Sequence, residues 1–262
     1  MDKAEIITSW NNAIDCIKFA IDYFRRAYRI PVSRLLPYDS LLVPFAFFFH
    51  QHGGMPEPEQ AQMLQELFWR VSLSGRYSSA TESKLAQDIK RVQLITDGRK
   101  PTYDDIRVNL DDPQALIDTS FTASNAYTKA VLCLLAYHEP KDFQKYALVI
   151  LDNSWLKQAN SRNYHHFSPR GYLKKQGLDN ANSLMNIVFV SDQLNKNKIR
   201  ARAPSKYIGE FQETNPVMAS TLQFHLIKAD GFGIEEDDYE MFLNARAKWV
   251  FAELNKRLHP DK

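Results

Sequence analysis

The sequence predicts a mainly α-helical protein with a small α+β insert in its second half. Three observations support this fold class. Over roughly the first 150 residues, apolar residues recur at steps of three and four, the period of helices with one buried face. From about residue 152 this period is lost, and Asn, Ser and Gly become frequent. The helical period then returns near the C-terminus.

Residues 1–150 are predicted to form a helical domain. Trp10, Ile14, Ile17, Ile21 and Phe24 predict a first helix that buries one face. A second helix is predicted in "LLPYDSLLVPFAFFFHQHGG", where the two glycines end it. Further helices are predicted in "MPEPEQAQMLQELFWRVSLSGRYSS", "SSATESKLAQDIKRVQLI" and "NAYTKAVLCLLAYH".

Residues 151–215 are predicted to form the insert. The run "NIVFVS" is short, apolar and β-branched, which indicates a strand. It precedes "DQLNKNKI", in which Asp192 is a candidate cap for a short polar helix. Residues 216–262 are predicted to pack back on the helical domain, because the stripe Leu243, Val250, Leu254 and Leu258 marks a helix with one apolar face.

The charge distribution is more informative than the total charge. The net charge of +2 does not indicate a nucleic-acid-binding protein. Between Arg162 and Lys206, however, nine basic residues accompany two acidic ones, a local charge of +7. Such a segment suits a phosphate backbone, and the alternative is an ordinary solvated surface.

The chain has no features of a secreted or membrane protein. Cys16 and Cys133 lie far apart within apolar helical patterns, which favours two buried thiols over a disulfide or a zinc site. The first residues contain no secretory apolar core. The longest apolar run, "SLLVPFAFFF", is about half the ~20 residues of a membrane span. These patterns predict a cytoplasmic protein without a membrane partner.

The stretch "NYHHFSPRGYL" places two histidines side by side. Neighbouring side chains of a strand point to opposite faces, so His165 and His166 suit separate tasks, one as a metal ligand and one as a base. The strand candidate at 187–190 would run antiparallel to them, and a short helix would bring Asn195 towards His165. Phosphodiester hydrolysis needs such a base and a divalent cation. Taken alone, the pair also fits a structural role.

Two further residues in "SGRYSS" leave two interpretations open. Arg76 and Tyr77 fit a contact with DNA or a partner module, and they fit a structural connection between helices equally well.

Over about 45 positions, the insert resembles an HNH, or ββα-metal, nuclease motif. It is similar in particular to the C-terminal domain of the GmrSD family of modification-dependent restriction endonucleases. The matching motifs are "HHFSP", "NIVFVSDQLNKNKI" and "APSKYI". The helical motifs "LLPYDSLLVPFAFFF", "FWRVSLSGRYSSATESKLAQDI" and "DYEMFLNARAKWV" extend the similarity to nearly the whole chain.

The resemblance implies a helical bundle that carries an HNH-like nuclease motif and acts as a metal-dependent DNA endonuclease of a restriction or phage-defence system. His166 would be the general base, and Asn186 would orient it. His165 and Asn195 would bind Mg²⁺ or Mn²⁺, and Lys198 would contact phosphate. The candidate DNA contacts in the basic segment are Arg170, Lys174, Lys196, Arg200 and Arg202.

Two positions affect these assignments. Ser168 replaces a bulky apolar residue of the family motif, and Asn197 could take the ligand role of Asn195. The resemblance also implies a ParB-like nucleotide-hydrolysing module, in cis or in trans, which makes this chain the nuclease half of a larger protein or complex. The alternatives are an inactive DNA-binding or assembly module on the same scaffold, and an RNA target.

Overall fold

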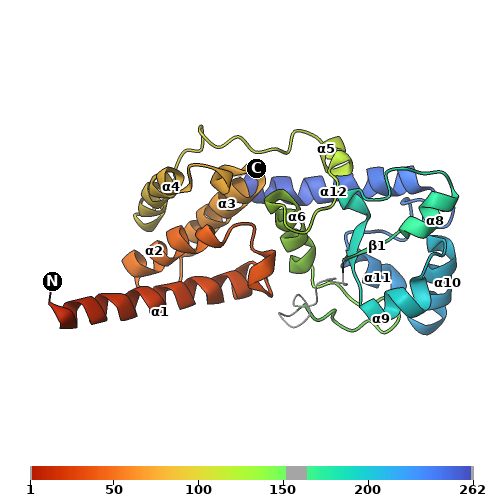
Figure 1. Cartoon of the computed structure of the whole chain (residues 1–262), viewed down its shortest axis with the longest axis horizontal. Coiled ribbons are helices and arrows are strands. Elements are labelled where there is room, and N and C mark those ends of the chain that lie inside the picture. Colours follow the sequence, from red (N-terminus) through yellow and green to blue (C-terminus); the bar gives the residue numbers. More distant parts are fainter. Residues whose placement is uncertain (1, 152–163, 261–262) are drawn as a thin grey trace. The chain divides into compact units, whose positions relative to one another are not determined.

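The computed structural model describes residues 2–151 and 164–260, and the predicted mainly helical fold with a small two-stranded sheet is confirmed (Figure 1). The helices are α1 Lys3–Ala27, α2 Leu42–His52, α3 Pro58–Ser74, α4 Thr81–Thr96, α5 Pro113–Asp118, α6 Ala126–Tyr137, α8 Arg170–Lys175, α9 Asp192–Leu194, α10 Pro204–Thr214, α11 Met218–Gln223 and α12 Tyr239–Leu258. The strands are β1 Tyr164–His166 and β2 Ile187–Phe189. Within the described ranges, no helix combines the length and apolarity needed to cross a bilayer.

The chain forms two compact units assembled from non-contiguous stretches. The first contains Met1–Asn109, Asn125–Ala130 and Asn255–Lys262, and the second contains Leu110–Ser124 and Val131–Leu254. Helices α6 and α12 contribute to both units, because the division falls inside each of them. The domain boundaries predicted at residues 150 and 215 stay predictions.

An aromatic core holds the first unit together. The rings of Phe24 on α1 and Phe45 on α2 meet edge to face at 4.6 Å, and Tyr28 packs on Phe68 of α3 at 4.8 Å. Helix α2 ends at His52 and is capped by Gly53, whose positive φ of 72° is the left-handed conformation that glycine adopts readily. The predicted stop is therefore confirmed.

The predicted buried face of α1 is only partly observed. The helix forms as expected, and Phe24 is buried near its C-terminal end. Trp10, Ile17 and Ile21 are exposed, at 69%, 41% and 40% respectively. A helical period identifies an apolar face, but it does not specify which element covers that face.

A buried ion network decides between the two interpretations of "SGRYSS". Arg76 is buried and donates from Nε to Asp88 at 2.8 Å, while Tyr77 donates its hydroxyl to the same carboxylate at 2.7 Å. Arg91 binds the other oxygen of Asp88 at 2.6 Å. These contacts connect α4 to the turn before it, so Arg76 and Tyr77 serve the fold.

The second unit surrounds the short sheet with aromatic side chains. Phe167 stacks on Phe242 of α12 at 4.5 Å, and Phe143 lies 4.7 Å from the His225 ring. His225 is almost fully buried and bonds through Nε2 to the carbonyl of Lys141 at 2.7 Å. Burial lowers the pKa of His225 to about 3, so this histidine is neutral and structural.

Candidate functional site

The two adjacent histidines lie on β1, as predicted from their sequence context. Strand β1 pairs antiparallel with β2, and the register places His165 opposite Val188 and His166 opposite Ile187. His165 is buried with 8% of its surface exposed, whereas His166 is half-buried. Because consecutive residues of a strand face opposite sides, the two rings occupy different environments.

The ring of His166 is held by Asn182, which the sequence analysis did not select. His166 Nε2 lies 3.2 Å from Asn182 Oδ1. The Asn182 amide nitrogen donates to Ser120 Oγ at 2.9 Å and to the Phe121 carbonyl at 3.1 Å. Because a carbonyl can only accept, the orientation of this amide is defined and Oδ1 must accept from His166. Nε2 therefore carries the proton, and Nδ1 is left as the acceptor of the ring.

The electrostatic surroundings keep His166 in its neutral form. Burial lowers its pKa, the hydrogen bond to Asn182 raises it, and the positive charge of Arg170 lowers it again. The net effect is a pKa below the ordinary value of 6.5. A neutral imidazole with one bare nitrogen is the form that a general base requires near pH 7.

Asn186 is fully buried and fixes the backbone that follows the histidines. Its Oδ1 accepts from the Ser168 amide at 2.8 Å, and its Nδ2 donates to the Ser168 and Ala181 carbonyls, both at 2.9 Å. The sequence analysis predicted that the Asn186 side chain orients His166. In the structure the hydrogen-bond partner of that ring is Asn182, and the side chain of Asn186 ties the segment after β1 to the loop before β2.

Two residues from distant helices support the same hairpin. The Tyr207 hydroxyl on α10 donates to the Phe167 carbonyl at 2.6 Å. Arg246 on α12 is 1% exposed, and its Nη1 donates to the Met185 and Ile187 carbonyls at 2.8 and 2.7 Å. Burial lowers the pKa of this guanidinium to about 9. Nothing in the local sequence marks Arg246 for this role, since its partners lie about sixty residues earlier.

The predicted short helix after β2 contains the two remaining site candidates. It starts at Asp192, but the cap is Ser191, whose side chain accepts from the Leu194 amide. The helix continues as a π-helical turn, Asn195–Ile199, closed by a 2.7 Å bond from the Arg200 amide to the Asn195 carbonyl. Single π-turns within helices are frequent at functional sites.

Asn195 and Lys198 have different surroundings within this turn. Asn195 is partly buried, whereas Lys198 is exposed. Lys198 and Asn197 line a shallow cavity of about 220 Å³ together with Lys145, Gln144 and Gln193. Asp142 also lines this cavity, so its lining carries charges of both signs.

Arg200 closes the π-turn in a strained backbone conformation. Its φ is 54° and its ψ is −129°, a region that residues with a side chain rarely adopt. Such strain costs about 1 to 3 kcal/mol and tends to occur at functional sites.

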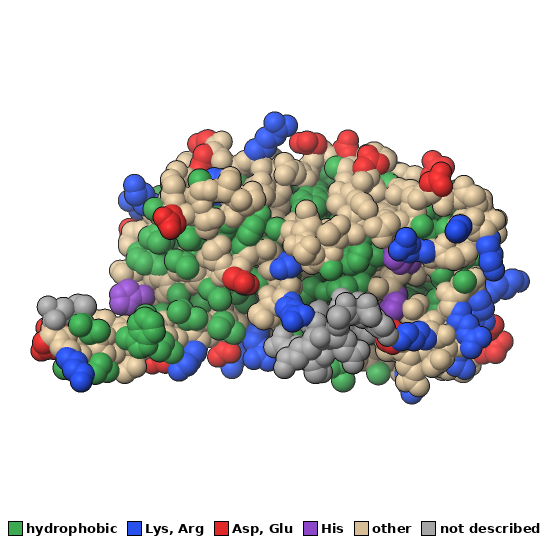
Figure 2. Space-filling view, viewed as in Figure 1, with side chains coloured by type: hydrophobic (Ala, Val, Ile, Leu, Met, Phe, Trp, Pro, Cys, Tyr) green, Lys and Arg blue, Asp and Glu red, His purple; other side chains and the backbone are tan. Residues whose placement is uncertain are grey.

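The candidate DNA contacts gather on α8 and on the segment from α9 to α10. Figure 2 shows Lys and Arg side chains over this region. Lys196 pairs with Asp192 at 2.7 Å, and Arg202 pairs with Glu210 at 2.5 Å. The positive charges of Lys196 and Arg202 are therefore partly neutralised. Arg170, Lys174 and Arg200 are exposed. Arg162, where the basic segment begins in the sequence, lies outside the described residues.

Gly171 on α8 lies close to the Ala201 side chain, between two basic segments. A Cβ added to Gly171 would lie 3.0 Å from Cβ of Ala201. This spacing is tighter than an ordinary van der Waals contact, so a larger residue at this position would require the turn that carries Arg200 and Arg202 to shift by a few tenths of an ångström.

The predicted metal ligands are one imidazole nitrogen and one amide oxygen. Among the residues that the structure describes, no three His, Cys, Asp or Glu side chains gather as a metal site. A nitrogen and oxygen donor set without thiolate fits Mg²⁺ or Mn²⁺, ions that commonly keep water and phosphate as further ligands. That His165 and Asn195 hold such an ion stays a prediction.

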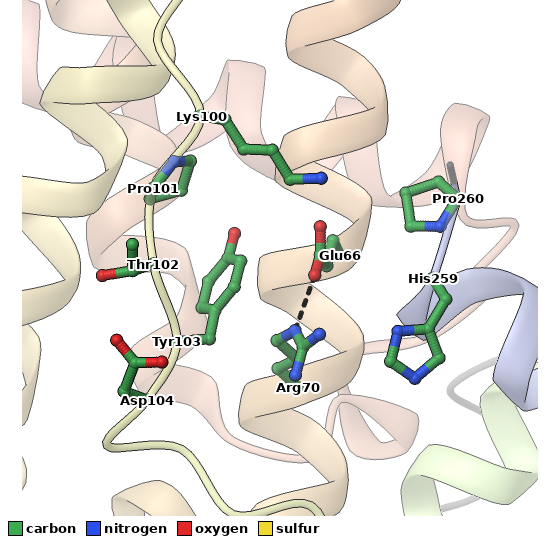
Figure 3. Close-up of a pocket in the computed structure, with 9 residues that line it drawn as sticks. All are labelled: Glu66, Arg70, Lys100, Pro101, Thr102, Tyr103, Asp104, His259 and Pro260. Atoms are coloured by element: carbon green, nitrogen blue, oxygen red, sulfur yellow. Dashed lines mark hydrogen bonds and ion pairs between the residues drawn. The ribbon is translucent and has the colours of Figure 1, made fainter. Parts of the chain in front are cut away.

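The first unit contains a cavity of about 380 Å³ that is unrelated to the histidine pair (Figure 3). Glu66 accepts from Arg70 Nε at 2.7 Å, and the Arg70 guanidinium lies 4.8 Å from the centre of the Tyr103 ring. Figure 3 shows the Lys100 side chain directed towards Glu66 as well. The Glu66 and Arg70 charges neutralise each other, which favours a structural role for this pair.

Comparison with known proteins yields one distant relative and no family. No protein-family model matches the chain, and no solved structure matches it significantly. The chain is 26% identical over 216 residues to an uncharacterised protein of Methanocaldococcus jannaschii. The match covers 78% of this chain and 35% of that protein, so the chain spans about a third of its relative's length. The resemblance to the GmrSD family stays a prediction.

Proposed function

We propose that this protein is a metal-dependent endonuclease of the HNH type that hydrolyses phosphodiester bonds in DNA. The observation that carries the proposal is the state of His166. It is neutral, its Nε2 proton is fixed by Asn182, and its bare Nδ1 is the one nitrogen able to accept a proton. Exposed basic side chains lie in the same unit, and a phosphate backbone would need such side chains near the base.

In the proposed reaction, His166 Nδ1 accepts a proton from a water molecule as the water oxygen bonds to phosphorus. The bond from phosphorus to the leaving oxygen breaks, and the charge released on that oxygen must be neutralised. His165 and Asn195 would hold Mg²⁺ or Mn²⁺, which when bound supplies that neutralisation. Lys198, exposed on the π-turn, binds a phosphate oxygen and positions the strand.

The proposal is tested with supercoiled plasmid, Mg²⁺ or Mn²⁺, and three forms of the protein. The unmodified chain is expected to nick the plasmid, and His166→Ala is expected to lower the rate about 100-fold or more, the usual contribution of a general base. His50→Ala is the matched control, because His50 is exposed and lies in the other unit. Equal rates for the unmodified chain and His166→Ala contradict the mechanism.

The same experiment separates the alternative functions. Salt-sensitive DNA binding without cleavage in either metal supports a non-catalytic DNA-binding or assembly module. Cleavage of single-stranded or structured RNA, with plasmid left intact, identifies an RNA target instead. Both substrates are therefore assayed with the same protein preparation.

A restriction or phage-defence role, and a ParB-like nucleotide-hydrolysing partner in cis or in trans, extend the proposal. They rest on the sequence resemblance alone. Comparison of plasmid from hosts with modified and unmodified DNA tests the first, and stimulation of cleavage by a candidate partner with nucleotide tests the second.

A further inference from the structure

Arg170 is an exposed cation that is not paired with an acidic side chain in the part of the chain that the structure describes. By contrast, Lys196 and Arg202 are held in ion pairs. Arg170 is the first residue of α8, the helix that follows β1 in the same unit (Figure 1). Its guanidinium is therefore available to an anionic ligand.

Three residues join β1 to α8, and hydrogen bonds hold the main chain of each. The Phe167 amide donates to the Asn186 carbonyl at 2.7 Å. The Asn186 side chain accepts from the Ser168 amide and donates to the Ser168 carbonyl, at 2.8 and 2.9 Å. The Pro169 carbonyl accepts from two amides of α8, at 2.9 and 3.0 Å. The main chain of Arg170 is therefore fixed relative to the strand that carries the two histidines.

The charge of Arg170 also acts on the imidazole of His166. Burial is the main cause that lowers the pKa of His166, and the positive charge of Arg170 lowers it further. The interaction between charges falls with distance and is screened by water and salt, so an exposed cation affects a ring only from nearby. The guanidinium of Arg170 therefore lies near the His166 ring.

The proposed reaction places the attacked phosphorus beside the same ring. A general base must lie within hydrogen-bond reach of the water that it activates, and that water bonds to phosphorus. A cation close to the base is therefore close to the phosphate that reacts. Negative charge builds on the oxygens of this phosphate during the attack, so a cation held there stabilises the transition state.

We propose that Arg170 binds the scissile phosphate itself and is a catalytic residue of this nuclease. This role rests on the proposed function, because only a protein that cleaves DNA has a scissile phosphate. The planar guanidinium presents parallel N–H donors that match two oxygens of one phosphate, which an ammonium group does not. Lys174, about 6 Å further along α8, contacts a neighbouring phosphate in this arrangement.

The role is tested first by single-turnover cleavage with the protein at saturating concentration, so that binding does not limit the rate. Arg170→Ala is expected to lower this rate about 100-fold, the usual effect of removing one donor that stabilises a transition state. Arg170→Lys keeps the charge and should recover part of the loss. Lys175→Ala is the matched control, because it removes an exposed charge from the same helix at a position with no assigned DNA contact, and it should leave the rate unchanged.

A second experiment identifies the phosphate that Arg170 binds. The cut position is mapped with the unmodified chain, and a duplex is made with an uncharged methylphosphonate at that position. Affinities for this duplex and for the ordinary duplex are measured in a His166→Ala background, which leaves both uncut. Adding Arg170→Ala should weaken binding to the ordinary duplex about tenfold, the usual worth of a charge-assisted hydrogen bond, and should leave binding to the methylphosphonate duplex unchanged. Adding Lys174→Ala should weaken binding to both duplexes equally.

Two results overturn the role of Arg170 and leave the proposed nuclease standing. One is an unchanged single-turnover rate for Arg170→Ala when the unmodified chain cleaves. The other is a loss of affinity in Arg170→Ala that is the same for both duplexes. A protein that binds DNA and cleaves none contradicts the proposed function and the role of Arg170 together.

Discussion

Substitution of Asn182 tests the arrangement of the candidate site most directly. Asn182→Ala removes three hydrogen bonds, to the His166 ring, to Ser120 Oγ and to the Phe121 carbonyl. Each is worth about 1 kcal/mol net, and water replaces part of this because Asn182 is half-buried. The free energy of unfolding should therefore fall by roughly 1 to 2 kcal/mol, and the protein should still fold.

The effect on His166 is more specific than the effect on stability. The hydrogen bond from His166 Nε2 to Asn182 favours the Nε2–H tautomer of His166 by about 1 kcal/mol. Without this bond the ratio of the Nε2–H to the Nδ1–H tautomer should fall roughly fivefold. The proposed cleavage rate near pH 7 should fall by at most about fivefold, because the rate follows the fraction of molecules with a bare Nδ1, which falls less than the ratio does. The Asn182 hydrogen bond raises the pKa of His166, so its removal should lower that pKa further.

Long-range ¹H–¹⁵N spectra of histidine-labelled protein report both the tautomer and the titration of His166. Asn180→Ala is the matched control, since Asn180 lies in the same loop with an exposed side chain. The acid limb of the pH–rate profile should move to lower pH in Asn182→Ala and remain in place in the control. An unchanged tautomer and an unchanged titration in a folded Asn182→Ala variant refute the role assigned to Asn182.

Three further predictions concern stability, pH and binding. Asp88→Ala should lower the free energy of unfolding by about 3 to 5 kcal/mol in chemical denaturation, because Arg76 would lose a buried carboxylate; a loss below 1 kcal/mol contradicts the buried network. His225 has a folded pKa of about 3 and an unfolded pKa of about 6.5, so the fold loses stability as pH drops below 6.5. Between pH 6.5 and 5 the loss should be roughly 2 kcal/mol and should disappear in His225→Gln. Arg200→Gly should raise the free energy of unfolding by up to about 1 kcal/mol, because glycine adopts the positive φ without strain. The same variant should bind DNA more weakly, and the salt dependence of that binding should fall by about one counterion. A variant with a lower free energy of unfolding contradicts the backbone strain assigned to Arg200.

The elements that could be predicted from sequence are those encoded by neighbours along the chain. The helical periods of the first half, the stop at Gly53 and the β-branched run of β2 all depend on local residues, and the structure confirms them. The antiparallel pairing of the histidine strand with β2 was also predicted, because the spacing of the two strand candidates allows a compact two-stranded unit.

The rest of the site depends on contacts between distant segments. Asn182 appears as one polar residue in a loop rich in asparagine, and its role depends on Ser120 and Phe121, about sixty residues earlier. Arg246 lies inside an apparently ordinary C-terminal helix. Neither residue carries a signal in its own neighbourhood, since only the fold brings the partners together.

The close packing of Gly171 on Ala201 has a thermodynamic consequence. It places α8, with Arg170 and Lys174, beside the turn that carries Arg200, so cations from two segments belong to one folded surface. A polyanion that spans both segments binds only the folded arrangement and stabilises it. Phosphate-rich ligands should therefore raise the melting temperature. A Gly171→Ala variant, in which the neighbouring turn must shift by a few tenths of an ångström, should respond to them less.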